Sequence, residues 1–407
     1  MTCETLSPSR RAVLGVSGAL FAWAFMPRFA HAAGGRDPRF VTIILRGALD
    51  GLTAVPPLGD PDYAGLRQTI ALSATGPNAA LPLDGFFALH PSMPNFARLY
   101  GAGEAAVVHA SATAYRDRSH FDGQDVLESG YAMPGRTDSG WLNRLLQGMP
   151  QGENVAPRSL DAAHGLAVGT TAPLVIRGKA PLLGWAPATL RPADPDLPSR
   201  LMELYHHTDP LLAQLLAEDI ATGKIATGLD VKARGGPGDP MGMQQMATGA
   251  ARLLAQPDGP RIAALAFEGW DTHAQEIGRL SHLLTGLDGA LAAFERELGP
   301  AWKDTAIVVA TEFGRTARVN GTDGTDHGTG TTAFLAGGAI KGGRIIADWP
   351  GLKQQQLRDG RDLAATTDLR AVIKGLAVDL LGVGPAALSR DVFPGSDGVA
   401  PMRGLIA

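Results

Sequence analysis

Residues 40–52, FVTIILRGALDGL, combine an unbroken apolar, β-branched run with a glycine at Gly47 and an acid at Asp50. Apolar residues that do not alternate with polar ones are typical of a strand buried on both faces, as in a parallel sheet. Four similar runs follow along the chain: AAVVHASA (105–112), PRIAALAFEGWDTH (260–273), DTAIVVATEFGRT (304–316) and TTAFLAGGAI (331–340). These runs predict the strands of one central sheet.

Helical segments separate the strand-like runs. Between residues 277 and 298, apolar residues recur every three or four positions, which predicts a long amphipathic helix. LRAVIKGLAVDLLGV (369–383) predicts a second helix, and residues 196–256 predict a helical insertion, with a cap over the sheet as one arrangement. Because the two kinds of segment alternate, we predict an α/β fold with a mostly parallel central sheet flanked by helices.

The N-terminal segment has the pattern of an export signal. Paired arginines, Arg10 and Arg11, precede an apolar run and the small-residue pattern Ala30-His31-Ala32, so we expect a twin-arginine signal over 1–32 and export to the periplasm or medium. The apolar run of about 14 residues is shorter than the roughly 20 that span a bilayer, which disfavours a retained anchor. Residues 33–407 are then expected to form one domain, with the translocase as a partner during export.

Composition limits the chemistry further. The formal net charge is −4 and no basic cluster stands out, which argues against a nucleic-acid partner. The single cysteine, Cys3, lies inside the predicted signal, so the mature chain would have no thiol. A metal would therefore have His, Asp and Glu ligands, which favours divalent ions such as Zn, Mn, Mg or Ca.

Acids follow three of the predicted strands at their C-terminal ends: Asp50, Asp271 and Glu312. In open parallel sheets the ligand site lies beyond the carboxyl ends of the strands, where residues distant in sequence converge. A single acid after a strand is more often a turn former or a helix cap. The repetition is what indicates a site.

Two histidines accompany these acids. In GWDTH, Asp271 and His273 project from one face if the chain stays extended and can bind one ion, whereas the alternative is a helix N-cap at Asp271 or Thr272. In GTDHG, His327 follows Asp326, and the flanking glycines would let the backbone approach an ion closely. The alternative for His327 is a loop histidine held by Asp326.

RDRSHFDGQD (116–125) resembles a loop that enters a helix. A hydroxyl at a helix N-terminus, Ser119, is well placed as a nucleophile toward an anionic substrate, and Arg116 and Arg118 suit phosphate or sulfate oxygens, as does Arg315 of TEFGRT. His120 and Asp122 are candidate proton-transfer groups or metal ligands. The alternative is a capping box formed by Ser119 and Asp122.

The ordered set of these residues resembles the alkaline phosphatase-like superfamily, which includes sulfatases and cofactor-independent phosphoglycerate mutases. The segments LRGALDGL, RSHFDGQDVLESG, GWDTHA, TEFGRT, GTDHGTG and TTDLRAV are similar, more narrowly, to a family of exported bacterial proteins, domain-of-unknown-function family 1501. The resemblance implies an alkaline phosphatase-like fold and one or two divalent ions. It implies that Asp271, His273 and His327 hold one ion, and that Asp50 and Glu312 contribute to another.

One departure from the superfamily pattern bears on activity. Glu312-Phe313 stands where an Asp-His pair is usual, so one imidazole is missing, and His120, Asp122 or Asp326 could replace it. We expect a metal-dependent hydrolase of small phosphate or sulfate esters. The alternatives are a non-catalytic metal- or carbohydrate-binding protein on the same fold and, less favoured, a scaffold without metal.

Overall fold

The central sheet forms around β1 (Arg39–Leu45), whose seven residues are all buried. In the computed structural model of the chain, Val41, Ile43 and Leu45 pack into the apolar core on one face of the sheet, and Phe40 and Ile44 pack into the core on the other. The described residues are 36–149, 165–187, 201–202, 205, 210–227 and 235–407. The predicted export signal, including Cys3, and parts of the predicted insertion lie outside them.

The sheet has nine strands within the described residues, in the order β10-β4-β9-β8-β1-β7-β5-β6, with β11 beside β4. Strand β9 is antiparallel to β4 and β8, and the other pairings are parallel. The predicted mostly parallel sheet is therefore confirmed. Its further strands are β4 (Ala105–Ala112), β5 (Gly165–Val168), β6 (Leu182–Trp185), β7 (Ile262–Phe267), β8 (Thr305–Thr311), β9 (Thr331–Ala336), β10 (Arg344–Ile346) and β11 (Thr367–Asp368), and a separate hairpin pairs β2 (Leu81–Pro82) with β3 (Ala88–Leu89).

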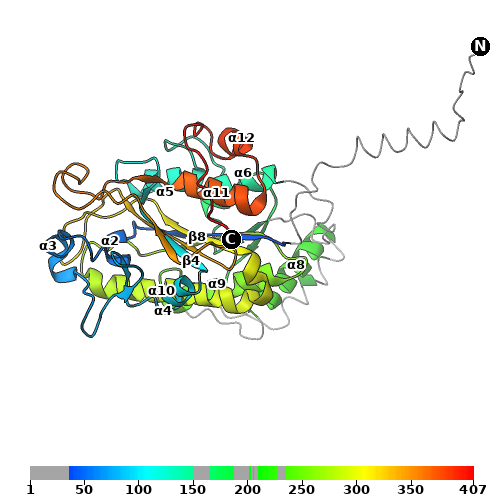
Figure 1. Ribbon diagram of the computed structural model, residues 1–407. Helices are drawn as coiled ribbons and strands as arrows, with labels where there is room; N and C mark the ends of the chain where they lie inside the picture. The colour runs from blue at the N-terminus through cyan, green and yellow to red at the C-terminus, as the bar shows by residue number, and fades with distance from the viewer. Residues whose placement is uncertain (1–35, 150–164, 188–200, 203–204, 206–209, 228–234) are drawn as a thin grey trace, which may run out of the picture. The chain divides into compact units, whose positions relative to one another are not determined.

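Helices cover both faces of the sheet (Figure 1). On one face lie α4 (Pro94–Gly101), α9 (Pro240–Ala255) and α10 (Glu276–Leu298), and on the other lie α5 (His120–Ser129), α6 (Trp141–Gly148) and α11 (Leu369–Leu381). The other helices of the described residues are α2 (Gly51–Ala54), α3 (Tyr63–Arg67), α8 (Pro210–Thr227) and α12 (Pro385–Ala387), with short 3₁₀ turns at Gln68–Ile70, Leu174–Ile176 and Gly299–Asp304 and a π turn at Leu388–Val392. In the described residues, no helix is both long and apolar enough to cross a membrane.

The structure shows how two of the predicted helical segments are placed. Helix α9, within the predicted insertion, packs on the sheet, because Met243, Ala247 and Leu254 are buried in the core with residues of β1 and α10. Helix α10 begins at Glu276 with Gln275 as its N-cap, so neither Asp271 nor Thr272 caps it. Those two residues are left in the preceding loop, where they can serve the site.

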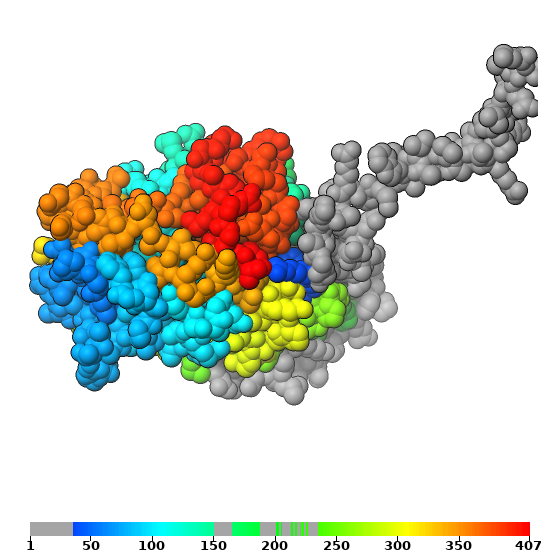
Figure 2. Space-filling model, viewed as in Figure 1, coloured from blue at the N-terminus to red at the C-terminus, as the bar shows by residue number. Residues whose placement is uncertain are grey.

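The carboxyl ends of β1, β4, β7 and β8 share one edge, because these strands run in the same direction. The start of β9 lies at that edge as well, since β9 runs the opposite way. Segments from the first hundred residues and from about 310–365 meet there, coloured blue and orange at the left of Figures 1 and 2. Hydrogen bonds such as Val319 N to Leu66 O, 3.1 Å, join them.

Candidate metal centre

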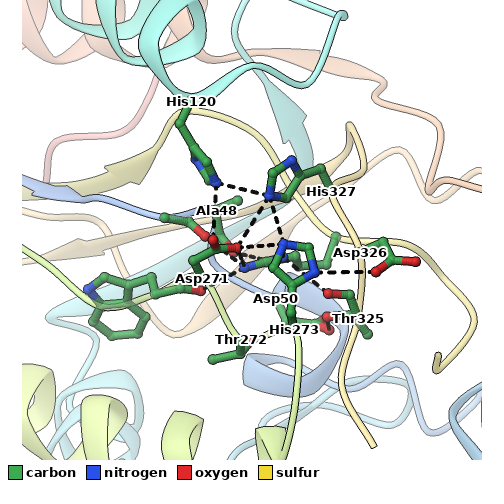
Figure 3. Close-up of polar contacts among 12 residues, drawn as sticks. Ala48, Asp50, His120, Asp271, Thr272, His273, Thr325, Asp326 and His327 are labelled. Carbon is green, nitrogen blue, oxygen red and sulfur yellow. Dashed lines mark hydrogen bonds and ion pairs between the residues drawn. The ribbon is translucent and has the colours of Figure 1, made fainter. Parts of the chain in front are cut away.

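Three histidines and one aspartate converge at this edge of the sheet (Figure 3). His120 is the first residue of α5, Asp271 and His273 lie between β7 and α10, and His327 lies just before β9. Ligand atoms of His120, Asp271 and His327 all lie within 4.8 Å of one another. The cluster is partly open to solvent, since its side chains are between 24% and 43% exposed.

The Nε2 atom of His327 is at the centre of the cluster. It lies 2.9 Å from Nε2 of His120, 3.0 Å from Nε2 of His273 and 3.3 Å from Oδ1 of Asp271. The same Oδ1 lies 3.0 Å from Nε2 of His273, and Oδ2 of Asp271 lies 3.6 Å from Nε2 of His120. Nε2 of His273 thus reaches His327 and Asp271, while the set whose ligand atoms all lie within 4.8 Å of one another consists of His120, Asp271 and His327.

The Nδ1 atom of each of the three imidazoles lies within hydrogen-bonding distance of an acceptor. Nδ1 of His120 lies 2.8 Å from Oε1 of Glu312, Nδ1 of His273 lies 3.2 Å from Oδ1 of Asp326, and Nδ1 of His327 lies 3.1 Å from the carbonyl oxygen of Arg118. Carboxylates and carbonyls only accept, so each Nδ1 must carry its hydrogen. In the neutral rings the three Nε2 atoms therefore turn lone pairs toward one another.

This donor set fits a divalent cation. Ligands bound about 2.0–2.1 Å from a tetrahedral zinc ion lie roughly 3.3 Å apart, which is close to the separations between these nitrogens and oxygens. A shared proton can bridge only one pair of nitrogens, whereas a cation can accept all the lone pairs. Imidazole donors suit Zn, Fe, Ni and Cu better than Mg or Ca.

Charged neighbours set the electrostatics of the cluster. Burial alone would raise the pKa of Asp271, but the paired Arg315 guanidinium lowers it below the ordinary range. The hydrogen bond to Glu312 raises the pKa of His120, and burial, with His120 nearby, lowers the pKa of His327. Asp271 and His327 are therefore ready to bind a cation near neutral pH, and a proton competes most strongly at His120.

Phe313 packs against the imidazoles. Its ring stacks on His120 with the centroids 5.0 Å apart and contacts His327 at 5.3 Å, and the residue is 2% exposed. Phe313 thus packs against two of the converging rings from the side.

The other predicted metal ligands lie outside the converging set. Glu312 is buried behind His120 and also accepts hydrogen bonds from Gly47 N and Gln124 Nε2, at 2.9 and 3.1 Å. Asp326 contacts His273 and does not hold His327, which corrects the alternative reading of GTDHG. Asp122 is exposed on α5, where its carboxylate accepts from the Tyr115 hydroxyl at 3.3 Å.

Asp50 belongs to a separate buried cluster. Its carboxylate pairs with Arg67, which also contacts Glu276 at 3.3 Å, and its Oδ1 caps α2 through Thr53 N at 3.0 Å. The structure does not bring Asp50 and Glu312 together as joint ligands, because a guanidinium already neutralises Asp50. Sequence reasoning missed Arg67 and Glu276, which follow no strand and carry no recognisable motif.

The predicted anion-binding arginines all have partners. Arg315 donates to the carbonyls of Ala48, Gly47, Trp270 and Thr325 and pairs with Asp271. Arg118 pairs with Asp362 at 2.7 Å, and Arg116 donates to the carbonyls of Thr113 and Tyr115. Ser119 is the N-cap of α5, as expected, but its side chain makes no capping hydrogen bond.

The glycines around His327 serve loop packing rather than approach to an ion. A Cβ on Gly328 would lie 2.4 Å from the Arg315 carbonyl carbon, and one on Gly324 would lie 2.3 Å from that of His273. Gly47 plays the same part at β1, with φ +121° and a Cβ position 2.4 Å from Asp271 N. These close approaches bring the ligand-bearing loops together.

Comparison with known proteins gives one family and several distant structures. The family model described as "Protein of unknown function (DUF1501)" matches residues 37–375. No curated protein matched. Among solved structures, the chain is similar to Ps i-CgsB in complex with k-i-k-neocarrahexaose (13% identity, TM-score 0.39, covering 76% of this chain and 68% of that chain). It is also similar to a putative sulfatase from Bacteroides thetaiotaomicron VPI-5482 (10%, 0.39, 85% and 71%) and to a protein in the alkaline phosphatase superfamily from Vibrio parahaemolyticus (12%, 0.33, 74% and 60%).

Proposed function

Because the chain belongs to the DUF1501 family, whose description gives no activity, we propose its function from the site: a hydrolase of small phosphate or sulfate esters that depends on one divalent metal ion. The observation that carries the proposal is the convergence of three imidazole Nε2 atoms whose Nδ1 atoms are all held by acceptors. The ester substrate class comes from the resemblance of the ordered residue set to the alkaline phosphatase-like superfamily.

In this proposal, His120, His273 and His327 bind the ion through Nε2, and Asp271 binds it through its carboxylate, which also pairs with Arg315. Glu312, Asp326 and the Arg118 carbonyl hold the rings in the metal-binding tautomer, as partners behind metal-bound histidines commonly do. A bound divalent ion would supply Lewis acidity toward an ester oxygen and would activate a nucleophile at neutral pH. The exposed side of the cluster gives a substrate access.

Ser119 is our candidate nucleophile. It directly precedes His120 at the start of α5, where the helix N-terminus favours an anionic oxygen, and its hydroxyl is free of a capping bond. Attack by the Ser119 hydroxyl would break the ester bond, release the alcohol and leave a covalent phosphoryl- or sulfuryl-serine that water then hydrolyses, whereas direct attack by water would form no covalent intermediate. Mass spectrometry of the trapped protein, with Ser119→Ala as the matched variant, distinguishes the two routes.

Metal content tests the proposal directly. Protein loaded with Zn and then dialysed should retain about one ion per chain by elemental analysis, and Asp271→Ala and His327→Ala should lose it while still unfolding cooperatively. His282→Ala and Asp122→Ala change an exposed histidine and an exposed acid outside the cluster and should retain it. An unchanged metal content in Asp271→Ala and His327→Ala would contradict the proposal.

A second candidate function is metal-dependent ligand binding without turnover, including binding of carbohydrate. One observation favours it: Arg315, Arg116 and Arg118 all bond to other groups of the protein. None of these three guanidinium groups is therefore free to bind the anionic part of an ester substrate. A screen of aryl phosphate monoesters, phosphodiesters and sulfate esters with added Zn, Mn, Mg or Ca separates the two. Turnover that is lost in Asp271→Ala supports the hydrolase, and bound metal without turnover supports the binding protein.

A further inference from the structure

Behind the metal centre lies a buried carboxylate, Glu276, the first residue of α10. Its Oε2 accepts from the hydroxyls of Thr325 at 2.6 Å and Thr272 at 3.3 Å. Its Oε1 accepts from the hydroxyl of Thr53 at 2.9 Å and lies 3.3 Å from Nη2 of Arg67. Both oxygens are therefore used, and the side chain is 0% exposed.

Two of these hydroxyls come from the loops that carry the converging histidines. Thr272 is the residue between Asp271 and His273, and Thr325 is two residues before His327. The two loops also meet directly, since Thr325 N donates to Thr272 O at 3.2 Å. A single carboxylate thus fixes both loops to the start of α10.

Thr325 connects this carboxylate to the metal-facing side. Its backbone carbonyl accepts from Nη1 of Arg315 at 3.1 Å, and Nη2 of Arg315 pairs with Asp271. Its hydroxyl lies 3.1 Å from Oδ2 of Asp50 as well as 2.6 Å from Glu276. Any shift of Thr325 would therefore move Arg315, and through it the carboxylate of Asp271.

Charge helps to hold the arrangement. Arg67 is fully buried and lies between the carboxyl groups of Asp50 and Glu276, so Asp50 cannot rotate away without leaving a buried charge unpaired. Burial and the nearby Asp50 raise the pKa of Glu276 to about 8.

We infer that Glu276 and Thr325 are positioning residues for the proposed metal centre, because they set the relative placement of the loop carrying Asp271 and His273 and the loop carrying His327. The inference rests on the proposed function. Neither residue touches the converging point, so their effect is on how well the ligand atoms are placed. Loss of the Thr325 hydroxyl should widen the spread of ligand positions and weaken metal binding.

The test compares variants that differ by one hydroxyl. Thr325→Val removes it at nearly constant volume, and Thr325→Ser keeps it. Thr285→Val removes an exposed hydroxyl elsewhere on α10, one that donates to the Ser281 carbonyl. Zinc affinity is measured by competition with a chromophoric chelator, and thermal unfolding is measured with the metal removed. We expect Thr325→Val to bind zinc roughly 10-fold more weakly, which is the low end of the losses in metal affinity seen when a residue that orients a metal ligand is replaced. The zinc affinities of Thr325→Ser and Thr285→Val should stay within about twofold of that of the original protein.

The outcomes separate two failures. If the unaltered protein does not bind zinc, the proposed function is wrong. If it binds zinc and Thr325→Val binds equally well, the positioning role is wrong. Should Thr325→Val fail to unfold cooperatively, Thr272→Val tests the same carboxylate from the other loop: weakened zinc binding supports the role, and unchanged binding overturns it.

Discussion

Replacing Glu312 by glutamine tests whether the charge behind His120 controls the metal centre. The change is close to isosteric, and the buried partners can all be kept. The remaining carbonyl oxygen can accept from Gly47 N and His120 Nδ1, and the new amide can donate to the Thr311 hydroxyl, which can donate in turn to the Leu45 carbonyl at 2.7 Å. The fold should therefore persist while the negative charge is lost.

The expected loss of zinc affinity at pH 8 is about 10–100-fold, the range for partners that orient metal-bound histidines, which is roughly 1.4–2.7 kcal/mol. The pH dependence gives a second signature. Glu312 raises the pKa of His120 above its ordinary value, so in the unaltered protein a proton competes with the metal from a higher pH downward. In Glu312→Gln that competition begins at a lower pH. As the pH falls, the unaltered protein therefore loses zinc affinity first, and the difference between its affinity and that of Glu312→Gln should become smaller.

The assay is chelator competition at several pH values between 5.5 and 8, with thermal unfolding of the metal-free proteins as a control. Equal affinity of the two proteins at pH 8 would show that the Glu312 charge does not act on the centre. A difference that widened as the pH fell would refute the assigned direction of the His120 shift.

Three further predictions follow from the same contacts. Phe313→Ala should cost about 3–5 kcal/mol in urea unfolding, because a buried ring is lost, and should also weaken zinc binding through the loosened His120; unchanged stability would contradict the packing. Arg118→Gly should keep its zinc affinity, because the backbone at φ +62° suits glycine and the backbone carbonyl that accepts from His327 remains. The same change should lower the free energy of unfolding by about 1–3 kcal/mol, because buried Asp362 loses a partner. Chelator treatment should lower the melting temperature by several degrees, because zinc at 1,000 times its Kd adds about 4.1 kcal/mol; no shift would mean that zinc does not bind the native protein.

The sheet could be predicted from the sequence because its strands are buried on both faces. The runs ending near Leu45, Ala112, Phe267 and Thr311 are continuous in apolar residues, and each corresponds to a strand of the structure. The short strands β5, β6, β10 and β11 were not predicted. They have two to four residues each, too few for periodicity to show.

The candidate site was partly accessible to sequence reasoning, for a topological reason. The family resemblance groups Asp271, His273 and His327, and the structure brings them together because β9 runs antiparallel and begins at the edge where β7 ends. The sequence does not single out His120 from the other candidate ligands, since the rotation of a helix relative to a sheet is set by packing. The contact with Phe313 is part of that packing.

The buried cluster of Asp50, Arg67 and Glu276 bears on how many ions the chain binds. Two carboxylates with threonine hydroxyls around them would suit a hard cation, but the guanidinium of Arg67 already lies between them. A guanidinium is covalently attached and always charged, so it cannot be removed by a chelator or exchanged for a metal. We therefore expect metal content to saturate at one ion per chain rather than two, with that ion lost when His120, His273, His327 or Asp271 is replaced by alanine.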